Sequence, residues 1–429
     1  MIFNTINASL GPDTPRDFVP GGQEQTETLY NVDFVYRMDI GLASDLNIAF
    51  GAEYREEDFD LYAGDAASYQ LGPLADQGFS SSSNGFGGFP ENTSASQDST
   101  AFYVDLEGDL TEALTVQAAV RNEDFSTFGD TTDYKLAGIY RLTNDFRIRG
   151  AFSTGFHAPT AGQANITNVT TQIVGGSLTD QGTLPLFSAP GQLAADYIES
   201  QGNGRPTLGP EEAENFSIGV AFDLENSSWT IDYYNIDIQG YIDEYSAQQT
   251  LDQCYKAGRA DVCALIRRVD GDLTSPSSGI ELYTRNLDYI KTSGVELSWN
   301  AGIDLNRWGS LRIGSQINSY LKNKTRSDSL SPEIDCNGYY GTNCAPTSKT
   351  RMVTRATWTY NRITASLRWR YLSGVAIERS QAAKTYAAFR EIDSYSYFDL
   401  FAGYTFFDDR LNLSLGIENI TDKEPPIVG

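Results

Sequence analysis

Apolar and polar residues alternate along most of this chain, with the period of two that is typical of β-strands. In Leu411–Ile417, Leu and Ile occupy every second position, and small or polar residues stand between them. Successive side chains of a strand point to opposite faces, so such a segment has one apolar and one polar face. The pattern predicts about fourteen strands, which begin near Thr26, Leu46, Ser99, Leu114, Asp133, Phe146, Glu212, Trp229, Leu282, Leu311, Arg351, Ile363, Tyr395 and Leu411.

The connections between these strands alternate between short and long. Short ones are expected at Gly41–Leu46, Thr111–Glu112, Thr143–Asn144, Glu225–Ser228, Asn306–Gly309, Asn361–Arg362 and Asp408–Arg410. Every intervening connection is long except the one at Gly129–Thr132. Tight turns at one end and long loops at the other are typical of an antiparallel up-and-down transmembrane β-barrel. A soluble β-sandwich would instead scatter its loop lengths over both ends.

Composition and charge narrow the function further. The formal net charge of −26 argues against a nucleic-acid partner, because phosphate binding needs a basic surface. The sequence has no run of roughly 18 apolar residues, so we expect no transmembrane helix. It also has no phosphate-binding loop, no nucleophile elbow and no cluster of histidines, so we expect neither an enzyme nor a metal site or cofactor.

Four cysteines form two close pairs along the chain. Cys254 and Cys263 stand in one predicted loop, and Cys336 and Cys344 stand in another. Two separate local pairs favour two disulfides that each clamp a loop, which requires an oxidising compartment; four free thiols are the alternative. The segment around the first pair, Ser246–Val269, also has some helical periodicity, so we expect a short helix there.

Several segments together resemble one known family. Arg149–Thr160, Arg205–Val220, Asn286–Trp299 and Ile417–Pro426 are similar, in this order, to segments of the C-terminal barrel of TonB-dependent outer-membrane receptors. Phe50–Glu57 and the cysteines of the first pair fit as well. In the first segment His157 stands where the family usually has Arg. The resemblance spans most of the chain.

The resemblance implies a fold and a function. Family members have a 22-stranded barrel with an N-terminal plug inside it. We therefore expect residues 1–429 to form part of such a barrel, with the plug domain and the final strand missing. The intact receptor would be a monomer in the bacterial outer membrane, in contact with lipid and lipopolysaccharide. It would take up a scarce solute, such as an iron-siderophore, haem, vitamin B12 or a carbohydrate, with energy from the TonB complex acting through the plug.

Candidate binding residues follow from the predicted loops and strands. Aromatic and imidazole side chains in long loops are suited to contact a small-molecule or oligosaccharide substrate, and these are Phe79, Phe86, Phe89, His157, Tyr339 and Tyr340. Five arginines on the polar faces of strands are expected to line the lumen: Arg121, Arg147, Arg149, Arg368 and Arg370. Each of these residues could instead be ordinary loop or barrel surface.

Two other classes of protein remain compatible with the alternation. A passive porin-like barrel would need a closed set of strands and no plug. A secreted β-sandwich adhesin or glycan-binding protein would carry disulfides, and Asn-x-Ser/Thr triplets such as the one at Asn165 would fit it.

Overall fold

The protein is described by a computed structural model. It describes residues 2–3, 7–77, 79, 81, 87–166, 168–174, 177–183, 185–186, 189–200, 205, 207–268, 278–407 and 410–426. Within these ranges no helix is long and apolar enough to cross a membrane.

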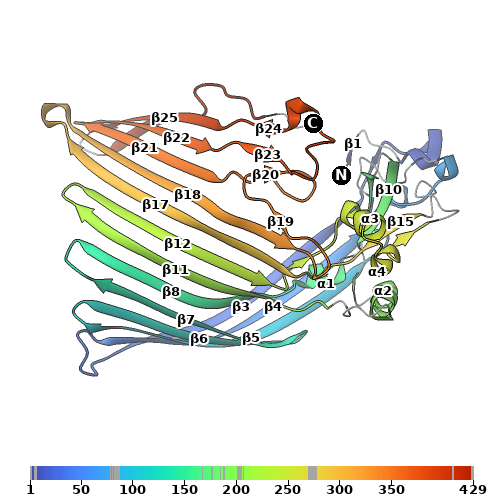
Figure 1. Cartoon of the computed structure of the whole chain (residues 1–429), viewed down its shortest axis with the longest axis horizontal. Helices are drawn as coiled ribbons and strands as arrows, with labels where there is room; N and C mark the ends of the chain where they lie inside the picture. Colours follow the sequence, from blue (N-terminus) through green and yellow to red (C-terminus); the bar gives the residue numbers. More distant parts are fainter. Residues whose placement is uncertain are drawn as a thin grey trace.

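One large antiparallel sheet dominates the structure (Figure 1). Fourteen of its strands lie side by side in chain order, and the short β19 (Ile334–Asp335) pairs with one of them. The fourteen are β3 (Gly21–Met38), β4 (Leu46–Ala63), β5 (Thr93–Thr111), β6 (Leu114–Phe125), β7 (Gly129–Arg141), β8 (Phe146–His157), β11 (Glu211–Leu224), β12 (Ser227–Gln239), β17 (Tyr289–Asp304), β18 (Ser310–Arg326), β21 (Thr350–Tyr360), β22 (Ile363–Leu372), β25 (Tyr395–Phe406) and β26 (Leu411–Ile417). The structure thus confirms the predicted strands and their up-and-down order.

Tight turns join the strands at one end of the sheet. Tyr360 pairs with Ile363 and Leu224 pairs with Ser227, which leaves two residues in each turn. Asn361 and Glu225 take positive φ there, as the first central residue of a two-residue hairpin turn usually does. The predicted turn at Asp408–Arg410 includes Asp408 and Asp409, which lie outside the described residues.

Several predicted boundaries differ from the structure. β3, β5 and β7 begin earlier than predicted, at Gly21, Thr93 and Gly129. Two other boundaries were wrong for identifiable reasons. The ninth strand begins at Tyr289 rather than near Leu282, because Leu282 belongs to a short loop strand and packs with Ile280 and Ala247 in a small buried cluster. The short loop-side connection lies at residues 126–128, because Gly129 already pairs with Phe125.

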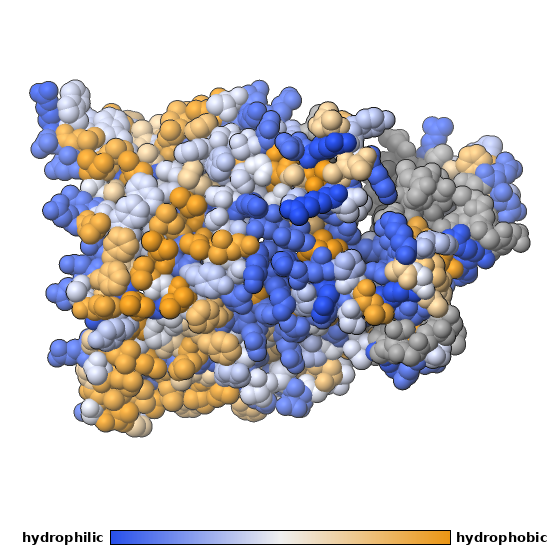
Figure 2. Space-filling view, viewed as in Figure 1, coloured by the Kyte–Doolittle hydropathy of each residue, from blue (hydrophilic) through white to orange (hydrophobic). Residues whose placement is uncertain are grey.

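The strands carry the expected two faces. Phe102, Val120 and Leu400 are among many large apolar residues of the sheet that are more than a third exposed. We call this the apolar face, and we call the side that carries Arg121 and Arg149 the polar face. On the visible side of the molecule, hydrophobic residues gather over the half nearest the tight turns, whereas polar residues prevail toward the loops (Figures 1 and 2).

Aromatic rings form a row on the apolar face near the tight turns. Phe146, Phe222, Trp229 and Trp299 come from β8, β11, β12 and β17. Their neighbouring ring centroids are 6.4, 6.1 and 5.4 Å apart. Outer-membrane barrels carry aromatic girdles of this kind where the apolar band meets the polar interface.

Small elements fill the long connections at the other end. Short helices are η1 (Ala8–Asp13), η2 (Ala66–Ser68), η3 (Ala75–Gln77), α1 (Ala161–Asn165), α2 (Ala189–Ser200), α3 (Ala247–Tyr255), α4 (Ala260–Cys263) and η5 (Ala387–Phe389), while η4 (Asn306–Trp308) lies in a tight turn. Short strands are β1 (Ile2–Phe3), β2 (Asp17–Phe18), β9 (Asn168–Val174), β10 (Ser177–Thr183), β13 (Ile242–Asp243), β14 (Ile266–Arg267), β15 (Gly279–Leu282), β16 (Arg285–Asn286), β20 (Tyr339–Tyr340), β23 (Val375–Ile377) and β24 (Glu391–Ile392).

These loops have their own small cores rather than one continuous core. Tyr241, Tyr245, Val262 and Leu287 form one buried cluster, against which Ile238 and Ile290 of the large sheet pack. The loop elements are thereby fixed to the strand ends of β12 and β17. The predicted helical segment is confirmed as the pair α3 and α4.

A charge introduced on the apolar face should impair assembly. Val120 is 46% exposed on β6, so Val120→Arg should reduce the folded protein recovered from membrane fractions, because a lipid-facing arginine costs roughly 2–4 kcal/mol near mid-bilayer. Gln117→Arg is the matched control on the same strand. It places the charge on the polar face beside Asp105, which Gln117 already contacts at 2.8 Å. Equal yields of the two variants would contradict the assignment of the faces.

Candidate functional site

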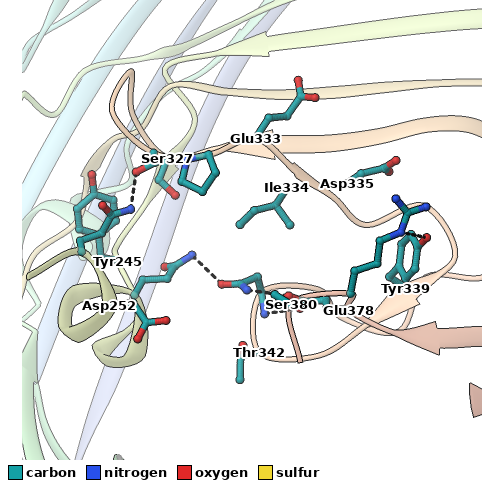
Figure 3. Close-up of a pocket in the computed structure, with 16 residues that line it drawn as sticks. Tyr245, Asp252, Ser327, Glu333, Ile334, Asp335, Tyr339, Thr342, Glu378 and Ser380 are labelled. Atoms are coloured by element: carbon teal, nitrogen blue, oxygen red, sulfur yellow. Dashed lines mark hydrogen bonds between the residues drawn. The ribbon is translucent and has the colours of Figure 1, made fainter. Parts of the chain in front are cut away.

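A cavity of about 450 Å³ lies at the loop end, between three separate segments of the chain (Figure 3). The first segment is α3, which contributes Gln249 and Asp252. The second runs from Ser327 to Asn343 through β19 and β20, and the third is Glu378–Ser380 after β23. We call this cavity the rim pocket.

Two disulfides fix the walls of the rim pocket. Cys254 at the end of α3 is bonded to Cys263 in α4, and Cys336 is bonded to Cys344 across the loop that contains β20. No free cysteine remains. The bonded cysteines are 9 and 8 positions apart in the sequence. Each bond therefore restricts the conformations of a short loop that has little hydrophobic core.

Hydrogen bonds join the segments across the pocket. The Gln253 side chain donates to Ser331 Oγ at 2.8 Å, and Gln249 Nε2 donates to Asn343 Oδ1 at 3.4 Å. Arg379 Nε donates to the Tyr339 hydroxyl at 3.1 Å, and its guanidinium lies 5.7 Å from the centre of that ring. The pocket is therefore walled by two clamped loops that contact each other directly.

Acidic groups slightly outnumber basic groups around the rim pocket. Its lining includes four carboxylates, those of Asp252, Glu333, Asp335 and Glu378, and the guanidinium of Arg379. Lys256 pairs with Asp252 at 2.6 Å and Lys324 pairs with Glu333 at 2.5 Å. The ammonium group of Lys324 and the Tyr289 hydroxyl hold the pKa of Glu333 below its ordinary value, so this carboxylate stays charged at neutral pH.

A second cavity, of about 570 Å³, lies on the polar face of the large sheet. Arg149, Arg351 and Arg370 line it together with Asp232 and Glu296. This cavity lies among the membrane-length strands and is more basic than the rim pocket. The loop end and the polar face of the sheet therefore each have a cavity, and the two cavities differ in charge.

The five predicted lumen arginines all lie on the polar face, and all are paired. Arg121 contacts Glu53 and Glu123, both at 2.8 Å. Arg147 contacts Asp223 at 3.3 Å, and Arg149 contacts Asp232 at 2.6 Å. Arg368 and Arg370 share the fully buried Asp399, at 2.7 and 3.0 Å. Their partners are carboxylates of the same sheet. That these arginines line a lumen stays a prediction.

The predicted loop residues do not converge on one site. Tyr339 lines the rim pocket, and Phe79 is 47% exposed elsewhere. His157, at the end of β8, contacts Glu211 through Nδ1 at 2.8 Å. Phe86 lies outside the described residues.

Two of the candidates are buried in the structure, and their role in binding stays a prediction. Phe89 is 2% exposed and packs with Phe59, Leu61 and Ala161 in a small buried cluster. Tyr340 is 5% exposed, its hydroxyl donates to the backbone carbonyl of Phe389, and it lines a smaller cavity together with Tyr395.

Sequence reasoning missed most of the rim pocket. Gln249, Asn343 and Glu378 come from distant parts of the chain, and nothing local marks them as neighbours. The cysteines were the one available signal, because Gln249 and Asn343 each stand within or near a clamped loop. Within the described ranges no group of three or more His, Cys, Asp or Glu residues is arranged to hold a metal ion.

The up-and-down sheet, its apolar face with an aromatic row and its long-loop end define an outer-membrane β-barrel type of fold. The chain belongs to the TonB dependent receptor-like β-barrel family, whose sequence profile matches residues 3–420. No curated protein sequence matches it.

Solved structures similar to this chain support the fold. The ferric enterobactin receptor PfeA of Pseudomonas aeruginosa is 13% identical with a TM-score of 0.63, and the match covers 94% of this chain and 49% of that one. The siderophore receptor PirA of Acinetobacter baumannii is 13% identical with a TM-score of 0.58, covering 94% and 51%. The ferric-catecholate import receptor Fiu of E. coli is 12% identical with a TM-score of 0.56, covering 94% and 51%. The chain thus spans about half the length of these receptors.

Removal of the Cys336–Cys344 disulfide should loosen one wall of the rim pocket. The Cys336→Ser, Cys344→Ser double variant should be cut by protease within residues 337–343 faster than the unmodified receptor, since a cross-link of this kind contributes roughly 2–4 kcal/mol. The same experiment with and without reductant on the unmodified receptor is the control. Protease sensitivity that does not change in either comparison would contradict a role for the disulfide in loop order.

Proposed function

We propose that this protein acts as an outer-membrane receptor for active uptake of a scarce small solute, of which an iron-siderophore complex is the leading candidate. Membership in the TonB dependent receptor-like family supports transport rather than catalysis. The similar solved structures include siderophore receptors, which supports the substrate class. Energy would come from the TonB complex, and the receptor would act as a monomer surrounded by lipid and lipopolysaccharide.

The rim pocket is the observation that carries the proposal. Its volume of about 450 Å³ is within the range of small-molecule sites, and its walls are held by two disulfides before any ligand arrives. A preorganised wall loses little conformational entropy on binding, which favours capture of a dilute ligand. Haem, vitamin B12 and carbohydrates remain the other candidate substrates.

The charge of the rim pocket favours one type of iron chelate over another. Four carboxylates and one guanidinium line it, and Lys256 and Lys324 pair with two of those carboxylates, so one negative charge is in excess locally. The whole chain has a formal net charge of −26. A ferric tricatecholate such as ferric enterobactin is a trianion and would be repelled by such a surface, whereas a neutral or cationic ferric hydroxamate would not. We therefore propose that the receptor favours the neutral or cationic type.

Uptake of labelled iron tests the proposed function. Cells that have this receptor as their sole uptake route should accumulate iron from cationic ferrioxamine B. Inactivation of TonB should abolish the accumulation, because binding alone supplies no energy for transport. Receptor-dependent accumulation that persists without TonB would contradict active transport and favour a passive pore.

A single neutralised carboxylate should shift the charge preference. Asp335→Asn keeps the acceptor for the backbone N–H of Asn337, which lies 3.0 Å from Asp335 Oδ1, and removes one charge from the pocket. The ratio of affinities for ferrioxamine B over ferric enterobactin should fall roughly two- to fivefold, since a hydrated unit charge several ångströms away is worth on the order of 1 kcal/mol or less.

The matched control is Asp196→Asn, at a carboxylate that pairs with Arg205 at 2.6 Å and does not line the pocket. An equal change of the ratio in both variants would mean that the overall charge, and not the rim pocket, sets the preference.

A further inference from the structure

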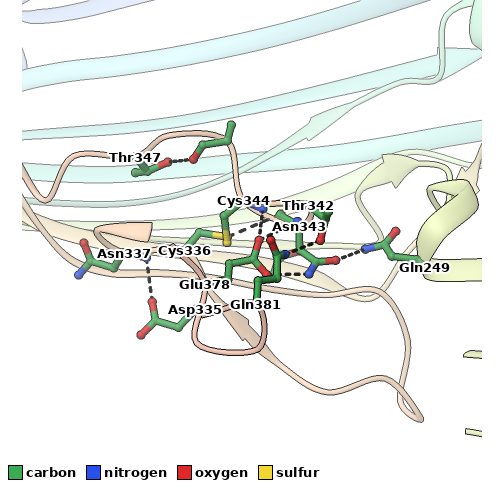
Figure 4. Close-up of a disulfide and its surroundings, with 12 residues drawn as sticks. Gln249, Asp335, Cys336, Asn337, Thr342, Asn343, Cys344, Thr347, Glu378 and Gln381 are labelled. Carbon is green, nitrogen blue, oxygen red and sulfur yellow. Dashed lines mark hydrogen bonds between the residues drawn. A yellow bond between two sulfur atoms is a disulfide. The ribbon is translucent and has the colours of Figure 1, made fainter. Parts of the chain in front are cut away.

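Glu378 stands where the three walls of the rim pocket meet (Figure 4). It follows directly after β23, and its side chain is almost wholly buried, with the residue 5% exposed. Glu378 Oε1 accepts hydrogen bonds from the backbone N–H groups of Asn343 at 2.7 Å and Cys344 at 2.9 Å. Glu378 Oε2 accepts a third from Asn343 Nδ2 at 2.7 Å.

The carboxylate has hydrogen-bond donors in place of a cation. In the part of the chain that the structure describes, no Lys or Arg forms an ion pair with Glu378. Removing a carboxylate from water is costly, and three N–H donors directed at its oxygens offset that cost. Such a group adds little net stability compared with an apolar residue, but it fixes the donors in one geometry.

The loop that Glu378 holds is also the loop that reaches α3. Asn343 Oδ1 accepts from Gln249 Nε2 at 3.4 Å. Gln249 is itself fixed by a capping box at the start of α3, in which its backbone N–H donates to Ser246 Oγ at 3.1 Å and its Oε1 accepts from the Ser246 N–H at 2.9 Å. A continuous series of contacts therefore runs from Glu378 through Asn343 to the helix that is clamped by the other disulfide.

The backbone around Glu378 is adapted to the same contact. A Cβ atom placed on Gly341 would lie 2.6 Å from Glu378 Oε1, closer than such atoms approach in proteins. The Glu378 backbone N–H also donates to the Tyr340 carbonyl at 2.9 Å. The first observation shows that Gly341 leaves room for this side chain, and the second shows that the backbone of residue 378 is paired with the same loop.

We propose that Glu378 is a positioning residue, which holds the Cys336–Cys344 loop against α3 through Asn343 and thereby sets the ligand affinity of the rim pocket. Only the effect on ligand affinity rests on the proposed function; the positioning of the loop does not. The disulfide limits how far the loop can open, and Glu378 selects the one arrangement in which Asn343 faces Gln249.

Hydrogen exchange of the complete receptor, with both disulfides intact, tests the positioning without any ligand. Glu378→Gln should speed exchange of the Asn343 and Cys344 amides and also of the amides of α3, because the amide group presents a donor toward Asn343 Nδ2. Gly341→Ala should produce the same pattern by displacing the carboxylate. Unchanged exchange in β17 and β18 would verify that the variants are folded.

Glu391→Gln is the matched control, since it neutralises an exposed carboxylate of the neighbouring β24. If α3 exchanges no faster in Glu378→Gln than in Glu391→Gln, the coupling of the two loops through Glu378 is overturned.

Uptake kinetics with ferrioxamine B then separate positioning from general destabilisation. Positioning predicts that Glu378→Gln raises the KM for uptake several-fold while the maximal rate per folded receptor stays unchanged. A lower maximal rate with an unchanged KM would overturn the effect on affinity. Absence of uptake in the unmodified receptor would contradict the proposed function instead, and the exchange experiment would still decide the positioning role.

Discussion

Backbone hydrogen bonding within the sheet is the constraint on which the rest of the structure depends. A strand in lipid has no water to satisfy its N–H and C=O groups, so each strand must pair with neighbours along its length. The fourteen strands pair in simple chain order, and this order places every tight turn at one end and almost every long loop at the other. The same pairing fixes the alternation of faces, since a shift of one residue would move Val120 and its neighbours to the polar side.

Charges on the polar face and in the loops are balanced locally. Arginines of the sheet contact carboxylates on their own or adjacent strands, as Arg149 does with Asp232 at 2.6 Å. At the loop end, small buried clusters and two disulfides replace a large core. In the rim pocket, Asp335 and Glu378 form no such ion pair among the described residues, and Asp252 and Glu333 pair with lysines. The proposed preference for neutral or cationic chelates follows from this distribution.

The sequence predicts the sheet well because its signal is periodic and repeated in every hairpin. The predicted strand start at Leu282 is wrong. The apolar residues there alternate as in a membrane strand, but Leu282 and Ile280 pack in a buried cluster of the loop. The sequence also gives no sign that Phe89, an aromatic residue in a Gly- and Ser-rich loop, packs against Phe59 and Leu61. The rim pocket was beyond sequence reasoning, since Gln249, Asn343 and Glu378 are brought together only by the folded loops. Of the aromatic loop candidates that the structure describes, only Tyr339 lines it.

A fluorescent label at the rim pocket of receptors in living cells tests the central claim most directly. Ser380→Cys places the label on an exposed lining residue that takes no part in the contacts of Glu378. The account predicts that ferrioxamine B quenches the label at low concentration, and that fluorescence returns as the chelate is transported, but only when TonB is active. If neither ferrioxamine B nor any other ferric chelate, haem, vitamin B12 or oligosaccharide changes the fluorescence, the rim pocket is not the capture site.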